Sequence, residues 1–265
     1  MTKFKKINQK KSEKVHNIGY YWLYGRHSVV AALKNKKRDY MSLILTEESR
    51  DYVLTCGIDL NHDKIPCEVV TYGEIGKLTK LPTYTTHQGI ALKTALLIQP
   101  SIYDVTTASC SKKYSTILML DKVNDPHNIG AIIRTAAAFE VDAVITTFDG
   151  VPEENGTIVK AACGAFESIP FIKVVNLKRC IDELKEDNYW ILGLDVAGKG
   201  EIGKQKLNYD KIALVLGSEE KGLRRLIVES CDVLLRIPVS DKVVESLNVS
   251  NAAAIGLYET YKREN

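Results

Sequence analysis

Short apolar runs alternate with amphipathic stretches along the second half of this chain. Six runs rich in Ile, Leu and Val have the length of buried strands, and helical patterns lie between and after them, including those at 176–185, 222–229 and 249–263. Strands separated by helices predict parallel βαβ units, and therefore an α/β domain built on a parallel sheet. The expected strands are TILML (116–120), AVITT (143–147), PFIKVV (170–175), YWILGL (189–194), IALVLG (212–217) and VLLRIP (233–238).

The N-terminal part carries a smaller α/β pattern of its own. Helices are expected at 28–34 and 73–80, and strands at 40–45, 67–72 and 89–94. A polar run rich in Ser, Thr and Lys follows and predicts a linker. We expect four parts along the chain: a basic flexible tail (1–16), a small α/β domain (17–97), a linker (98–114) and the domain with the parallel sheet (115–265).

The composition is that of an ordinary soluble globular protein, with 45% hydrophobic and 26% charged residues among 265. No run approaches the ~18 apolar residues that a membrane helix needs, and the N-terminus has no apolar signal segment. The six cysteines are scattered without a C-x-x-C pair. This pattern is typical of reduced thiols in a cytosol and does not indicate a zinc site or a disulfide scaffold. We therefore expect a cytoplasmic protein with no membrane segment and no bound metal.

The positive charge of the chain is concentrated at its N-terminus. The first fifteen residues hold six lysines and one glutamate, whereas the remaining body has 30 basic and 32 acidic residues. Such a basic arm is suited to contact the phosphates of a nucleic acid. A solvated terminus without a partner would have the same composition, so charge alone leaves both interpretations open.

Three loops that follow expected strands are rich in Asn, Gly and acidic residues. The first, at 121–130, contains Asn128 and Gly130 and leads into an apolar helix interrupted by Arg134. Glycine at a helix start lets a ligand or another backbone approach closely. The alternatives are that Asp125 or Asn128 only caps the helix, and that Arg134 only extends its charge to solvent.

The second loop, at 214–223, contains Gly217, Glu219 and Gly222, and the third, at 237–250, contains Asn248 before the last helix. Each alone could be a capped helix start. Because open parallel sheets bind ligands at the carboxyl ends of their strands, the three loops together predict one cleft. No G-x-G-x-x-G is present, and GKGEIGKQ (198–205) lacks the Ser or Thr of a phosphate-binding loop, so neither a dinucleotide nor an NTP site is indicated.

In order and spacing, the three loops resemble the three motifs of the SpoU-type RNA 2′-O-methyltransferases of the SPOUT superfamily. YGRHSVVAAL (24–33) and THQGIAL (86–92) are similar to the small substrate-binding domain of the branch that methylates a guanosine in large-subunit ribosomal RNA. One departure is that SDKVVESL (240–247) is a residue longer than the usual form, so the contacts of 240–244 do not carry over. The matching residues are Asn128, Gly130, Arg134, Gly217, Glu219, Gly222, Pro238, Ser246, Leu247, Asn248 and Ser250.

The resemblance implies a fold, a reaction and a cofactor. The expected fold is a C-terminal SPOUT domain with a parallel sheet and a deep trefoil knot, preceded by a ribosomal-protein-like α/β domain that binds RNA. The expected protein is a homodimer that transfers a methyl group from S-adenosylmethionine to a ribose 2′-hydroxyl, in a guanosine of 23S ribosomal RNA. The residues implied for the cofactor are Leu216, Gly217, Ile237, Leu247 and Asn248.

For catalysis, the resemblance implies Arg134, with Asn128, Glu219, Ser246 and Asn248 orienting it and the reacting groups. Because a guanidinium keeps its proton in proteins, we interpret Arg134 as an electrostatic activator that holds the RNA phosphate or the 2′-oxygen. Three alternatives remain at this point: a methyltransferase acting on tRNA, a non-catalytic RNA-binding or ribosome-assembly protein of the same fold, and an α/β enzyme acting on a small nucleotide. The intact set of polar residues favours catalysis over pure binding.

Overall fold

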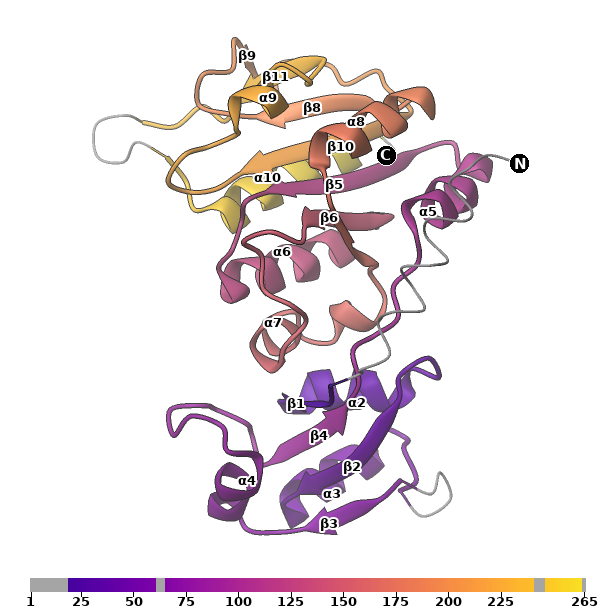
Figure 1. The fold of residues 1–265 in the computed structure, drawn as a ribbon, viewed down its shortest axis with the longest axis vertical. Helices are drawn as coiled ribbons and strands as arrows, with labels where there is room; N and C mark the ends of the chain where they lie inside the picture. The colour runs from indigo at the N-terminus through magenta and orange to yellow at the C-terminus, as the bar shows by residue number, and fades with distance from the viewer. Residues whose placement is uncertain (1–18, 61–64, 241–245, 264–265) are drawn as a thin grey trace. The chain divides into compact units, whose positions relative to one another are not determined.

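The computed structural model describes residues 19–60, 65–240 and 246–263 of the chain. The expected basic tail (1–16) and most of the longer loop (241–244) therefore lie outside the described residues. The chain forms two compact units, Met1–Ile98 and Gln99–Asn265 (Figure 1). No helix in the described ranges is long and apolar enough to cross a membrane.

Among its described residues, the first unit has a mixed four-stranded sheet and three helices. The strand order is β1-β4-β2-β3, in which β4 is antiparallel to β1 and β2, and β3 is parallel to β2. Apolar side chains from the sheet and from α4 form its core, among them Tyr24, Ile44, Ile75 and Ala91. The elements are β1 (Tyr21–Tyr24), α2 (Arg26–Lys34), β2 (Tyr40–Leu45), α3 (Glu47–Thr55), β3 (Cys67–Val69), α4 (Tyr72–Thr79) and β4 (Ile90–Thr94).

Helix α3 was not among the expected elements. Its sequence, EESRDYVLT, buries only Ser49 and Val53, so its apolar stripe is too thin to give a helical period. Capping defines the helix instead. The Thr46 side chain accepts the Ser49 N–H at 3.3 Å, and two glutamates, Glu47 and Glu48, occupy the first turn, where acidic side chains are favourable.

The second unit contains a seven-stranded sheet in the order β7-β6-β5-β10-β8-β11-β9, and all of its neighbouring strands run parallel. This confirms the predicted parallel sheet. The short β9 falls within 198–205, so that glycine-rich stretch is a sheet edge and not a phosphate-binding loop. The strands are β5 (Ser115–Asp121), β6 (Ala143–Thr147), β7 (Phe171–Val174), β8 (Trp190–Leu194), β9 (Gly200–Glu201), β10 (Lys211–Gly217) and β11 (Val233–Arg236).

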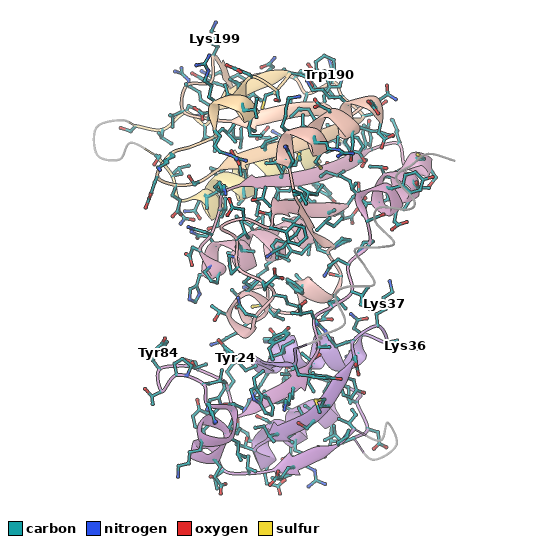
Figure 2. The ribbon with its side chains drawn as sticks, viewed as in Figure 1. Tyr24, Lys36, Lys37, Tyr84, Trp190 and Lys199 are labelled. Atoms are coloured by element: carbon teal, nitrogen blue, oxygen red, sulfur yellow. The ribbon has the colours of Figure 1, made fainter. Side chains whose placement is uncertain are left out.

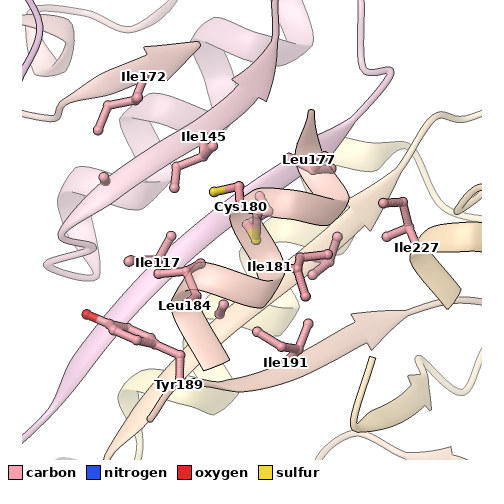
Figure 3. Close-up of a cluster of buried hydrophobic side chains, with 14 of the residues drawn as sticks. Ile117, Ile145, Ile172, Leu177, Cys180, Ile181, Leu184, Tyr189, Ile191 and Ile227 are labelled. Atoms are coloured by element: carbon pink, nitrogen blue, oxygen red, sulfur yellow. The ribbon is translucent and has the colours of Figure 1, made fainter. Parts of the chain in front are cut away.

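Helices cover both faces of this sheet. On one face α8 packs over β5, β6, β8 and β10, with α5 and α9 beside it (Figure 3). On the other, α10 packs on α6 and β10, and Gly256 lets it approach closely, because a Cβ there would lie 2.7 Å from Leu194 Cδ1. The helices are α5 (Ile102–Ala108), α6 (Pro126–Ala138), α7 (Gly156–Ala161), α8 (Leu177–Glu186), α9 (Arg225–Val228) and α10 (Val249–Tyr261).

The apolar core beneath α8 raises the pKa of a buried thiol. Cys180 points into this core beside Ile117, Ile145 and Ile181 (Figure 3). Burial raises the pKa of the Cys180 thiol to about 12, so it remains protonated at neutral pH. Cys180 is therefore a packing residue.

The stretch expected as a linker, 98–114, carries α5. Ser101 caps the helix: its hydroxyl accepts the Asp104 N–H at 3.2 Å, while the Asp104 carboxylate accepts the Ser101 N–H at 2.9 Å. Val105 then packs into the core of the second unit. The polar residues that suggested a linker are thus, in part, the caps of a short helix.

Candidate active site

The three predicted loops leave the sheet at the same edge. β5 and β10 are neighbours and end together, since Asp121 pairs with Gly217 in the register. β11 lies two strands from β10, with β8 between them. Because the strands are parallel, the segments that follow β5, β10 and β11 all emerge at the carboxyl ends.

One residue from each loop joins a hydrogen-bonded cluster. Asn128 Nδ2 donates to Glu219 Oε1 at 2.9 Å, and Asn248 Nδ2 donates both to Asn128 Oδ1 at 3.1 Å and to Glu219 Oε1. The backbone N–H of Val249 also donates to Glu219 Oε1, at 3.3 Å. A single carboxylate oxygen therefore accepts three N–H groups. This Asn128–Glu219–Asn248 cluster ties the three loops together.

The helix-cap alternative holds for some of these residues and not for others. Asp125 is the cap of α6, because its carboxylate accepts the His127 N–H at 3.0 Å, and Pro126 occupies the first helical position. The Asn128 side chain is therefore not needed as a cap and bonds to Glu219 instead. Asn248 does both, since its Oδ1 accepts the Ser250 N–H at 2.9 Å while its amide group joins the cluster.

A cavity of about 390 Å³ lies at the same strand ends. Its volume is within the range of roughly 300–1,000 Å³ that is usual for small-molecule sites. Glu219 links it to the cluster, and four of the five residues predicted to bind the cofactor line it. Asn248, the fifth, lies in the cluster and is not part of the lining. The predicted residues that line the cavity are Leu216, Gly217, Glu219, Ile237, Ser246 and Leu247.

The glycines in this region serve the protein's own packing. A Cβ on Gly217 would lie 2.0 Å from the carbonyl carbon of Gly222, so the loop folds back onto its own strand end. Gly222 itself has a φ of +62°, a conformation that glycine adopts without strain. On α6, a Cβ on Gly130 would lie 2.4 Å from the Cβ of Ala161 on α7. The close approach expected at Gly130 is thus made by another helix.

An ion pair between a buried carboxylate and a half-exposed arginine anchors the second loop and was not foreseen. Asp121, fully buried at the end of β5, accepts from Arg224 Nε at 2.7 Å and from Arg224 Nη2 at 2.6 Å through one oxygen. Its other oxygen accepts the backbone N–H of Arg224 at 3.0 Å. The loop is therefore held at both ends, by Gly217 packing on Gly222 and by Asp121 binding Arg224.

Asp195 is a cavity residue that sequence reasoning missed. Its carboxylate accepts the Ala197 N–H at 2.9 Å and the Leu223 N–H at 3.3 Å, and it lines the cavity beside Gly222. The signal was present in the sequence, because Asp195 directly follows the strand YWILGL, whose carboxyl end lies at the same edge.

Arg134 is placed apart from the cluster. It is exposed on α6, and its Nη1 lies 3.6 Å from the Sγ of Cys163, just beyond α7. It follows Asn128 by six residues, which is a rotation of about 240° around a helix, so the two side chains leave different sides of α6. Among the described residues, no hydrogen bond or ion pair connects Arg134 to Asn128, Glu219 or Asn248. One chain therefore assembles the polar cluster and the cavity without the arginine.

Within the described parts of the chain, no group of three or more His, Cys, Asp or Glu side chains is arranged to hold a metal ion.

The matches to known families follow the division of the chain. The SpoU rRNA Methylase family model matches residues 115–258, and the model for RNA 2′-O ribose methyltransferase substrate binding matches residues 22–99. This chain belongs to the SpoU rRNA methylase family.

Two SpoU relatives show how far the similarity extends. A 23S rRNA (guanosine-2′-O-)-methyltransferase RlmB from Xylella fastidiosa is 38% identical over 248 residues, covering 91% of this chain and 96% of its own. An uncharacterized tRNA/rRNA methyltransferase, slr0955, from Synechocystis sp. is 36% identical over 242 residues. That match covers 91% of this chain and 62% of the Synechocystis protein, which is therefore longer.

A solved SpoU structure confirms the fold. The SpoU methyltransferase AviRb from Streptomyces viridochromogenes, in complex with its cofactor AdoMet, superposes with a TM-score of 0.75 at 18% sequence identity. The superposition covers 93% of this chain and 91% of AviRb. The predicted SPOUT-type architecture, with a small α/β unit preceding the parallel sheet, is thus confirmed at the level of the fold.

Proposed function

We propose that the protein transfers a methyl group from S-adenosylmethionine to a ribose 2′-hydroxyl of ribosomal RNA, and that the acceptor is a guanosine of 23S rRNA. The observation that carries the proposal is the Asn128–Glu219–Asn248 cluster, which joins all three loops beside a cavity of small-molecule size. Family membership and the named activity of the Xylella relative support it. This substrate would place the protein with the ribosomal RNA of the cytoplasm.

The cavity suits S-adenosylmethionine in size and in charge. Its lining combines aliphatic side chains with acidic groups, and among the described residues the charged ones are Asp195, Glu219, Glu220 and Lys221. Such a surplus of carboxylates favours a ligand with a positive sulfur. Leu216, Gly217, Ile237 and Leu247 would hold the cofactor, which supplies an electrophilic methyl group when bound.

The protein's own groups would then prepare the acceptor. A ribose hydroxyl is a weak nucleophile at neutral pH and needs activation and placement. Arg134 would bind the phosphate or the 2′-oxygen through its planar guanidinium. Asn128 and Asn248 would hold Glu219 in one orientation, and Ser246 would position the reacting groups from the cavity wall.

We further propose that the active protein is a homodimer in which one subunit supplies Arg134 to the cluster of the other. The support is that Arg134 is exposed and lies apart from the cluster of its own chain. We also propose that the chain has the deep trefoil knot that the resemblance implies. Mixing Arg134→Ala and Asn128→Ala chains tests the shared site, because a mixed dimer would hold one intact site. About a quarter of wild-type turnover is expected after random exchange, and none if both residues act within one chain.

A methylation assay tests the reaction and the substrate together. The full chain is incubated with S-adenosylmethionine carrying a tritiated methyl group and with deproteinised ribosomal RNA or tRNA. A 2′-O-methyl group blocks alkaline cleavage of the following phosphodiester, so the modified position appears as an alkali-resistant dinucleotide. Label in 23S rRNA guanosine supports the proposal. Label in tRNA alone would favour the tRNA alternative, and no label in either would favour a non-catalytic RNA-binding protein.

A further inference from the structure

A second cavity, of about 610 Å³, lies in the first unit and has no part in the site described above. It opens where the beginnings of three helices meet the turn before β4. Arg26 begins α2, Glu47 and Glu48 begin α3, Tyr72 begins α4, and Gln88 belongs to the turn, and all five line the cavity. We refer to it as the Tyr72 cleft.

Tyr72 offers an aromatic surface to this cleft. Its ring stacks on the ring of His87 with centroids 4.1 Å apart and planes inclined by 31°. His87 is buried, at 5% exposure, whereas Tyr72 is 52% exposed. A buried ring thus supports an exposed one, which gives Tyr72 a fixed orientation without covering it. Exposed aromatic rings of this kind are the surfaces on which unpaired RNA bases stack.

The turn that lines the cleft at Gln88 and Gly89 is held by several contacts. Gln88 and Gly89 both have positive φ, of +58° and +74°. Gly89 leaves no room for a side chain, because a Cβ would lie 2.7 Å from Thr46 Oγ1. Arg26 fastens Gln88 by donating its backbone N–H to the Gln88 Oε1 at 3.0 Å and its Nε–H to the Gln88 carbonyl at 3.2 Å. The cleft is therefore formed before any ligand enters.

The charges around the cleft disfavour a phosphate in it. Arg26 Nη2 pairs with Glu48 Oε1 at 2.8 Å, and the neighbouring Arg50 Nη1 lies 3.5 Å from Glu47 Oε2. The Arg26 guanidinium that lines the cleft thus already faces a carboxylate, and a phosphate would gain little attraction from it. A nucleobase is uncharged, and its N–H edge can donate to carboxylate or amide oxygens. The chemistry of the cleft suits a nucleobase better than the sugar-phosphate backbone of RNA.

We propose that the Tyr72 cleft takes one unpaired nucleobase of the RNA substrate, stacked on Tyr72 with its edge towards Gln88 and the two glutamates. The proposal rests on the proposed function only in taking RNA as the substrate. Sequence-specific recognition of RNA uses bases that leave the helix stack, in bulges, loops and ends. The first unit would thereby select an RNA by a single extruded base.

Fluorescence of 2-aminopurine, which is quenched by stacking, tests the proposal with the full chain. The probe is a synthetic RNA hairpin with one bulged 2-aminopurine, and the matched probe has the same base paired in the stem. We expect wild-type protein to quench the bulged probe and to bind it about tenfold more tightly than the paired one. Tyr72→Ala should remove the quenching and weaken binding about 10- to 100-fold, whereas Tyr72→Phe should retain both.

The control variant is Tyr84→Ala. Tyr84 is 86% exposed in the same unit, on the loop between α4 and β4, and does not line the cleft (Figure 2). It should bind as wild type. The slope of log affinity against log salt should be the same for Tyr72→Ala and wild type, because no phosphate contact is lost. Thermal melting monitors folding, and Tyr72→Leu, which keeps apolar contact with His87, replaces Tyr72→Ala if the latter melts early.

Three outcomes would overturn the proposal. They are equal binding of bulged and paired probes, equal behaviour of Tyr72→Ala and Tyr84→Ala, and a reduced salt slope in Tyr72→Ala, which would reveal a phosphate contact instead. Methyl transfer to ribosomal RNA is measured separately. If wild-type protein methylates ribosomal RNA but does not quench the probe, this inference fails and the proposed function stands. If it quenches the probe but does not methylate, the proposed function fails and this inference stands.

Discussion

The side-chain amide of Asn248 donates to the same oxygen of Glu219 that accepts from Asn128, although 29 residues separate Asn248 from Glu219 along the chain. Asn248 is also the cap of α10. One side chain therefore both begins the last helix and orders the carboxylate of the second loop. The two roles can be separated by substitution.

Asn248→Ser keeps a capping hydroxyl and removes both amide donors, whereas Asn248→Ala removes the cap as well. We expect both variants to lose roughly 10²-fold in methyl transfer, because Glu219 is no longer held in one orientation. Asn248→Ala should cost about 1 kcal/mol more in the free energy of unfolding than Asn248→Ser. Rates under single-turnover conditions and urea unfolding check this. Wild-type turnover by the serine variant would show that the cluster is dispensable.

The Asp121–Arg224 pair should respond asymmetrically to substitution. Arg224→Met removes the guanidinium from the fully buried Asp121 carboxylate and leaves it the backbone N–H of residue 224, so the free energy of unfolding should fall by about 1–3 kcal/mol. Asp121→Asn should cost less, because the Arg224 side chain is 48% exposed and can turn to water. Urea unfolding of the two variants and of the double variant measures the difference. Equal losses of unfolding free energy in the two single variants would contradict the view that the buried Asp121 charge depends more on the pair than Arg224 does.

Gly217→Ala should disturb the loop before it disturbs any ligand. The new Cβ would meet the Gly222 backbone at 2.0 Å, so the turn must shift, at a cost of about 1–3 kcal/mol or more, and S-adenosylmethionine should bind more weakly. Gly73→Ala is the control, since nothing lies within 4 Å of a Cβ there. Melting and calorimetry with the cofactor distinguish the two. Unchanged melting with lost binding would instead indicate a direct clash with the ligand.

Arg134→Ala should be a catalytic defect without a folding defect. The side chain is exposed, so melting should match wild type, while turnover should fall about 10²–10³-fold through the loss of a preorganised donor. Arg134→Lys should restore little, because lysine lacks the planar fork. Arg225→Ala removes another exposed arginine, at 92% side-chain exposure, and serves as the control. Near wild-type turnover in Arg134→Ala would refute its proposed role.

The basic tail should contribute to RNA affinity through charge alone. Removing residues 1–15 deletes six lysines, and we expect weaker binding to ribosomal RNA together with a flatter dependence on salt, because fewer counterions are released. A full-length variant with these lysines changed to glutamine should behave like the truncation. Filter binding over a series of salt concentrations gives the slope. The interpretation of the tail as an uninvolved terminus holds if the slope is unchanged.

The sheet could be predicted because its inner strands are buried on both faces. All seven residues of β5 are buried, as are all five of β6, and each strand carries an unbroken apolar run in the sequence, 117–120 in β5 and 143–145 in β6. The helices that were missed lack such a signal. α3 buries two residues and begins with two glutamates, and α5 begins with a capping box that also occurs in loops. Their formation depends on caps and on tertiary contacts more than on apolar period.

The candidate site, too, could be predicted only in part. That Asn128, Glu219 and Asn248 lie together followed from the positions of their loops after parallel strands. The pair of Asp121 and Arg224 could not be foreseen, because 103 residues separate the partners and neither spacing nor composition links them. The geometry of a single chain also separates Arg134 from the cluster. The six-residue spacing between Asn128 and Arg134 already implied this separation, because it turns the two side chains about 240° apart on a helix.

The position of β10 between β5 and β8 has a consequence for the order in which the protein can be completed during synthesis. Both neighbours of β8 in the sheet, β10 and β11, come after it in the chain. In the second unit, a nascent chain that has not reached residue 211 can therefore pair only β5, β6 and β7, and β8 remains unpaired. Because Glu219 and Asn248 come later still, the ribosome must deliver almost the whole chain before the cluster can close.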